Sequence, residues 1–86
     1  MPKALKIVFS KHTIYQLKER NIPIKEIRKY LKNPDKIIKQ YSNRFRALKK
    51  LKILDKNYLL IIIFDKINSN IEIVTAFRTS KIRKYL

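Results

Sequence analysis

Seven consecutive apolar residues, Tyr58 to Phe64, constrain the fold of this 86-residue chain more than any other feature. Successive side chains of a strand point to opposite faces of a sheet, so a half-exposed strand alternates apolar and polar residues. A run that is apolar at every position is typical of a strand buried on both faces. The run is too short for a membrane-spanning helix, which needs about 20 residues. It therefore predicts the central strand of a sheet.

Three other segments are predicted to be strands of the same sheet. Residues 36–41 are short and rich in β-branched side chains, and residues 44–54 and 71–78 alternate in polarity. Thr75 falls on the apolar parity of the last segment and is expected in the core. Strands joined by short turns pair antiparallel, which predicts a meander. The chain has no glycine, and residues that tolerate or preset turn dihedrals separate the segments: Ser42-Asn43, Asp55-Lys56-Asn57 and Asn68-Ser69-Asn70.

The first 21 residues predict a strand and a helix. Alternation over residues 5–9, beginning at Leu5, indicates a short strand. Ser10 is expected to cap a helix that runs to about Arg20. Asn21 suits the left-handed conformation that ends many helices.

A second helix and the strands together predict the fold class. Pro23 suits the first turn of this helix, and Asn33-Pro34 ends it, because proline disfavours the helical state of the residue before it. A short helix or tail is expected from Ser80. The chain is predicted to be one α+β domain, residues 1–86, with a short first strand, two helices and a four-stranded antiparallel meander, the helices packed on one face. In the second helix, the apolar residues Ile24, Ile27 and Leu31 recur at intervals of three and four, which is the spacing of one helix face.

The surface of the chain is strongly basic. Twenty-two Lys and Arg against six Asp and Glu give a formal net charge of +16. Such a charge repels itself, so a polyanionic partner is expected, nucleic acid before others. The chain has no cysteine, and its acids share no close motif, so neither a metal nor a cofactor is expected. No secretion signal or membrane segment is recognisable, and the protein is expected in the cytoplasm.

One face of the predicted strand 44–54 forms a basic stripe about 25 Å long at the rise of a strand. Such a stripe can follow a phosphate backbone, and Arg can bind a phosphate with two hydrogen bonds. The alternative interpretation is an ordinary solvated strand face. Few acids are available to neutralise the stripe, which favours contact with a polyanion. Its members are Arg44, Arg46, Lys50 and Lys52.

Short motifs run through nearly the whole chain: Ser10-x-His12, Arg20, Glu26-Ile27, Asn33-Pro34, Val74-Thr75-Ala76-Phe77 and Lys84-Tyr85. Their order resembles the RelE-like toxins, a group of small barnase-related ribonucleases. It resembles more closely an uncharacterised domain family within or near that group. One departure is the predicted central strand, which lacks the cations that many RelE-like toxins carry.

The resemblance implies a metal-independent endoribonuclease in which the 2′-hydroxyl of RNA attacks the adjacent phosphate. His12 would be the general base, since the positive end of its helix disfavours the imidazolium form. Arg46 and Arg78 would stabilise the phosphorane oxygens. Arg20, about 80° from His12 around the helix, would share this site. The alternatives are a surface histidine for His12 and an ordinary end-of-helix cation for Arg20.

The remaining site residues are expected to hold RNA, either free or on the ribosome. The resemblance further implies a toxin–antitoxin pair, in which an acidic antitoxin-type protein covers the basic face. Two alternatives stay open: a nucleic-acid-binding module that does not cleave, and a basic subunit that docks an acidic protein. No membrane partner is expected. The predicted RNA-binding residues are Arg44, Lys50, Lys52, Thr79, Lys81, Lys84 and Tyr85.

Overall fold

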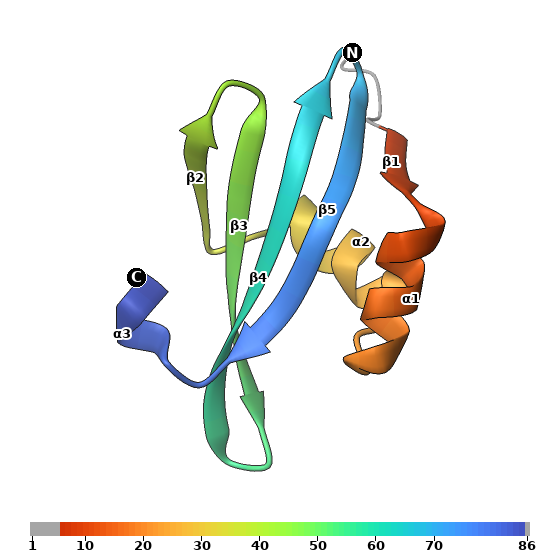
Figure 1. The fold of residues 1–86 in the computed structure, drawn as a ribbon. Helices are drawn as coiled ribbons and strands as arrows, with labels where there is room; N and C mark the ends of the chain where they lie inside the picture. Colours follow the sequence, from red (N-terminus) through yellow and green to blue (C-terminus); the bar gives the residue numbers. More distant parts are fainter. Residues whose placement is uncertain (1–5, 86) are drawn as a thin grey trace.

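A computed structural model describes residues 6–85, which fold as an α+β structure with five strands and three helices (Figure 1). The predicted order of a strand, two helices and a four-stranded meander is confirmed, and of the helix or tail expected after Ser80 the structure has a short helix. Leu5, the predicted start of the first strand, lies outside the described residues. The elements are β1 (Lys6–Phe9), α1 (Lys11–Glu19), α2 (Ile24–Lys32), β2 (Lys36–Tyr41), β3 (Arg44–Ile53), β4 (Lys56–Ile67), β5 (Asn70–Thr79) and α3 (Ile82–Tyr85).

The five strands form one sheet in the order β1-β5-β4-β3-β2. The meander β2 to β5 is antiparallel, as its short turns predicted, whereas β1 pairs in parallel with the first residues of β5. The apolar run lies in β4, between β3 and β5, which confirms its central position. The strand is longer than the run, because both of its ends continue as polar hairpin arms.

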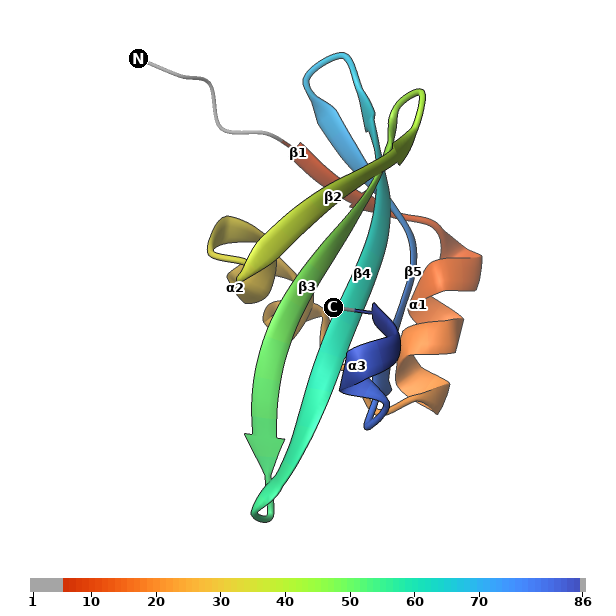
Figure 2. The same cartoon turned by 90° about the vertical axis from the view of Figure 1, so that its left-hand side faces the viewer.

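The two faces of β4 are covered differently. Leu60, Ile62 and Phe64 belong to the core cluster that α1 and α2 close through Leu17 and Ile27. The alternate side chains of β4 face the other side of the sheet, and α3 packs there. The two helices α1 and α2 thus cover one face, as predicted, and the four-residue α3 lies across the other (Figures 1 and 2). The apolar cluster between the sheet and α3 contains Leu48, Leu59 and Ile61, with Ile63, Phe77, Ile82 and Tyr85 packed against it.

A β-bulge in β5 overturns the predicted position of Thr75. Ile63 of β4 pairs with Thr75, but the next residue, Phe64, pairs with Ile73, so Val74 is an extra residue in β5. A bulge of this kind places two residues opposite one, and the alternation of side chains changes phase there. Thr75 therefore leaves the face of Ile73, and the prediction that it lies in the core is wrong.

Helix α1 takes over the edge of β5 where β1 ends. The ladder of β1 stops at Phe9, which pairs with Ile73. Thr13 of α1 is buried, and its hydroxyl donates to the carbonyl oxygen of Ile73 at 3.1 Å. Arg20 donates from one Nη atom to the carbonyl oxygen of Ala76 at 2.9 Å. Side chains of α1 thus bond carbonyl groups that an uncovered edge strand would leave without a partner.

Turns without glycine place other residues in the left-handed region. Asn21, Ser42 and Asn68 have φ between 46° and 55°, at turns that the sequence predicted. The β3–β4 hairpin has positive φ at both central residues, Leu54 (49°) and Asp55 (65°). Two successive positive φ values define a type I′ turn, for which Asn-Gly is the preferred pair. Leucine is a poor residue for this conformation, because its Cβ crowds the following carbonyl.

We expect Leu54→Asn to raise the free energy of unfolding by about 1 kcal/mol, because asparagine tolerates the left-handed region. The Leu54 side chain is 93% exposed, so its removal costs almost no packing. Urea denaturation of the two proteins measures the change. Leu54→Ala is the control, since it removes the same side chain without relieving the backbone. Equal stabilisation by both substitutions would contradict the argument.

Candidate nucleic-acid interface

The sheet face opposite α1 and α2, called the open face below, carries the predicted basic stripe. Register places its side chains in cross-strand rows that run from β3 through β4 to β5. Cations or polar groups occupy the ends of most rows, and apolar side chains of β4 lie between them. The rows are Arg46–Ile63–Thr75, Leu48–Ile61–Phe77 and Lys50–Leu59–Thr79.

Arg46 holds the most unusual position on the open face. Its Nε is buried and makes no hydrogen bond with any of the residues that the structure describes. Its guanidinium carbon lies 6.0 Å from the centre of the Tyr85 ring, within the range of a cation–π contact. A buried donor without a partner is uncommon in folded proteins. The two Nη atoms of Arg46 are not buried in this way and make no hydrogen bond within residues 6–85, so an oxygen acceptor that approaches the open face would meet these atoms.

Helix α3 brings Tyr85 onto the open face. The Tyr85 ring packs edge-to-face on Phe77 with 6.0 Å between ring centres, and Lys84 Nζ lies 5.8 Å from the same ring. The turn before α3 is fixed by Thr79, whose hydroxyl accepts a hydrogen bond from the backbone N–H of Lys81 at 3.0 Å. Of the predicted RNA-binding residues at the end of the chain, Tyr85 thus lies beside Arg46, Lys84 contacts the Tyr85 ring, and Thr79 and Lys81 form the turn before α3.

Arg44, at the end of the stripe, is already paired. Its Nε and one Nη donate to the two carboxylate oxygens of Asp65 at 2.7 and 2.9 Å, and it also contacts the hydroxyl of Tyr41. Hydrogen bonds from Arg44 hold the pKa of Asp65 below its usual range, against the opposing effect of burial. The other ion pair in residues 6–85 joins Lys49 and Asp35. Neither pair involves Arg46, Lys50 or Lys52.

His12 is exposed on α1 and belongs to a chain of hydrogen bonds that includes Thr75 of the open face. Arg20 donates to the hydroxyl of Thr75 at 2.9 Å, and that hydroxyl donates to Gln16 Oε1 at 3.1 Å. The Gln16 amide then donates to His12 Nε2 at 3.2 Å. This direction makes Nε2 the acceptor nitrogen of the neutral ring. Arg20 and His12 are therefore connected through two residues that had not been predicted as site residues.

The sequence indicates that Gln16 lies near His12 and Arg20, but it gives no such indication for Thr75. Gln16 lies four residues after His12 and four before Arg20, the spacing at which side chains of a helix are neighbours. This spacing is a local signal that places Gln16 beside both residues. Thr75 had none, because its position depends on the bulge at Val74.

Arg78 lies on the wrong face for the predicted catalytic role. It pairs with Leu60, a residue of the core under α1 and α2, and its guanidinium donates to the carbonyl oxygen of Asn21. The bulge also explains this difference, because it moves the even-numbered residues after Val74 to the helix side. The structure therefore separates Arg78 from Arg46, although it brings Arg46, Tyr85, Lys50 and Lys52 to one face.

Two other features of the described residues bear on the kind of site. No group of three His, Asp or Glu side chains among them lies close enough to hold a metal ion. None of the described helices is long and apolar enough to cross a membrane.

The fold and the site define a small α+β domain with a cationic sheet face, and a comparison of the sequence with family models gives its family. Residues 9–84 match the family described as "Domain of unknown function (DUF4258)", and the chain belongs to it. A search of curated proteins and a search of solved structures each gave no match. The link to RelE-like ribonucleases stays a prediction.

The Arg44–Asp65 pair makes stability depend on pH. The pKa of Asp65 is lower in the folded chain than its unfolded value of about 3.9. The stabilisation is therefore complete above that pH and is lost as the pH falls through the folded pKa. We expect Asp65→Asn to lower the melting temperature at pH 7, and the difference from wild type to shrink below pH 4. Glu19→Gln, at the exposed end of α1, should show no such dependence.

Proposed function

We propose that this protein is a metal-independent endoribonuclease of the RelE-like kind, which binds single-stranded RNA on the open face. The observation that carries the proposal is Arg46, a guanidinium with a buried, unpartnered Nε beside an aromatic ring. An RNA phosphate supplies the acceptor oxygens that such a group lacks, and Arg can bind phosphate with two parallel hydrogen bonds.

The surroundings of Arg46 support RNA over a small anion. Lys50 and Lys52 continue the positive charge along β3, and neither belongs to an ion pair within residues 6–85. Tyr85 is half-buried and offers an aromatic surface next to Arg46 and Lys84. Cationic grooves with aromatic side chains are the usual surfaces for single-stranded nucleic acid, because phosphates contact the cations and bases stack on the rings.

The proposed chemistry uses His12 as the base. His12 Nε2 exchanges its hydrogen bond with Gln16 for the 2′-hydroxyl of RNA and takes that proton. The 2′-oxygen forms a bond to phosphorus, the bond from phosphorus to the 5′-oxygen breaks, and this oxygen takes a proton from water. Arg46 binds the phosphorane oxygens as their charge develops. The products are a 2′,3′-cyclic phosphate and a 5′-hydroxyl.

An acidic antitoxin-type partner would cover the open face when the enzyme is inactive.

A second candidate function, RNA binding without cleavage, is favoured by one observation. Every side chain in the hydrogen-bond chain from Arg20 through Thr75 and Gln16 to His12 already has a protein partner. The acceptor nitrogen of His12 is bonded to Gln16. A chain of side chains engaged in this way holds α1 against the edge of β5 and requires no catalytic role. A basic subunit that docks an acidic protein is the third candidate, and it predicts weak RNA binding.

Cleavage of a mixed-sequence single-stranded RNA in EDTA separates these functions. We expect the wild type to cut and to leave 2′,3′-cyclic phosphate ends. His12→Ala should reduce the rate about 10²- to 10⁴-fold, through loss of the base. Arg46→Ala should reduce it about 10²- to 10³-fold, through loss of a cation on the phosphorane oxygens.

Arg28→Ala is the matched control, because Arg28 lies on α2 against Phe9, on the other side of the sheet. It removes the same charge and should leave the rate unchanged. Equal binding without cutting by wild type and His12→Ala would establish the second candidate. Equal loss of activity in Arg28→Ala and Arg46→Ala would show that only total charge matters and would overturn the site.

A further inference from the structure

The β3–β4 hairpin extends beyond the end of β5. Strand β5 ends at Thr79, opposite Leu59, whereas β3 and β4 stay paired as far as Ile53 and Lys56. The hairpin therefore continues as a two-stranded ribbon, which projects from the sheet in Figure 2. The chain leaves β5 at this point and turns back over the open face to form α3.

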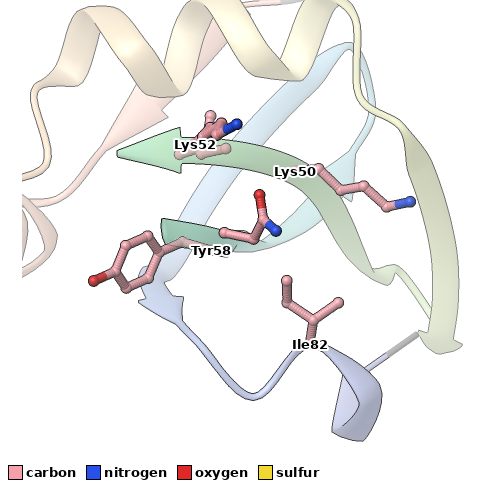
Figure 3. A pocket seen from close by; sticks show the side chains of 6 residues that line it. Lys50, Lys52, Tyr58 and Ile82 are labelled. Carbon is pink, nitrogen blue, oxygen red and sulfur yellow. The ribbon is translucent and has the colours of Figure 1, made fainter. Parts of the chain in front are cut away.

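A pocket lies between this ribbon and α3, with a volume of about 390 Å³. Figure 3 shows Lys50 and Lys52 on β3 and Ile82 on α3, on opposite sides of it. Thr79 holds the connection in place by accepting the backbone N–H of Lys81. The volume is within the range of sites that bind small organic groups. The lining residues are Lys50, Leu51, Lys52, Asn57, Tyr58 and Ile82.

The lining combines three kinds of chemistry. Lys50 and Lys52 are exposed cations, and none of the six residues is a carboxylate. Asn57 pairs with Lys52 across the hairpin and offers both a donor and an acceptor. Ile82 supplies apolar surface, whereas Leu51 and Tyr58, which pair with each other, line the pocket from strand positions that belong to the other face, and Leu51 packs there against the core under α1 and α2. A free inorganic anion would use only the lysines, whereas an unpaired base attached to phosphates would use all three kinds of group.

We propose that this pocket is a base-binding subsite for single-stranded RNA. One unpaired base enters between Ile82 and the hairpin, the Asn57 amide hydrogen-bonds its edge, and Lys50 and Lys52 contact the adjoining phosphates. The inference rests on the proposed function, because it takes RNA as the ligand of the open face. Lys50 is four residues from Arg46 along β3, about 13 Å, so the subsite lies apart from the phosphate at Arg46.

The subsite adds sequence preference to a face that otherwise binds through charge. Contacts with phosphates carry no sequence information, whereas an Asn amide can discriminate between base edges. Removal of Asn57 should therefore change which RNA is bound, and removal of a lysine should weaken all RNA alike.

The test measures the affinity of fluorescent RNA pentamers that are 2′-O-methylated at every sugar and so cannot be cleaved. The series contains adenine, uracil, cytosine and abasic pentamers. We expect Asn57→Ala to lower the affinity for the preferred pentamer about tenfold and to leave the abasic pentamer unchanged. Lys50→Ala should weaken all four equally and reduce the slope of log K against log[salt] by about 0.7.

Asn43→Ala is the matched control, because Asn43 lies in the β2–β3 turn at the opposite end of β3 and is also exposed. It should bind every pentamer as the wild type does. Unchanged binding of all pentamers by Asn57→Ala, or equal loss for the abasic pentamer, would overturn the subsite alone. A wild type that binds none of the pentamers would overturn the proposed function together with the subsite.

Discussion

The burial of β4 on both faces is the constraint on which the rest of this structure depends. An 86-residue chain with two short helices can cover one face of a five-stranded sheet, and α1, α2 and the turn between them do so through Leu17, Ile27 and Ile22. The other face of β4 is equally apolar but receives only the single turn of α3. The cover is therefore partial. Leu59 and Ile61 are nevertheless fully buried, and Ile63, which pairs with Arg46 of β3, is only partly buried.

At the edge of β5, side chains that the proposed function uses also have a structural role. β1 pairs with only the first residues of β5, and α1 continues the edge with Thr13 and Arg20. Arg20 donates hydrogen bonds both to a carbonyl oxygen of β5 and to the hydroxyl of Thr75. It therefore positions the chain of hydrogen bonds that ends at His12. A loss of activity on replacing Arg20 would thus include a displacement of α1.

The sequence predicted the elements well because each depends on neighbouring residues. The apolar run, the turn residues and the cap at Ser10 are local signals, and the structure has a strand, turns and a helix at those places. The stripe on β3 was also predictable, because alternation within one strand decides it. The family is shown by the comparison of residues 9–84, and the motifs alone indicated an uncharacterised domain family.

The errors concern positions that depend on pairing between strands. Arg78 and Thr75 change faces because of one extra residue in β5, which no pattern of side chains marks. The pairing of Arg44 with Asp65 joins residues 21 positions apart, and only the register of β3 and β4 brings them together. The position of α3 over the open face was likewise invisible, because the last strand and Ile82 meet only once the sheet has formed.

The extra residue in β5 also has a consequence for comparing this chain with other members of its family. A relative that lacks the counterpart of Val74 would pair β4 and β5 without interruption and still keep the counterparts of Thr75, Phe77 and Thr79 on the same side of the sheet. A relative that loses a residue further along would turn the remainder of the strand over. A comparison of β5 between this chain and such a relative therefore has to place its gap at Val74, because a gap elsewhere would exchange the residues of the two faces.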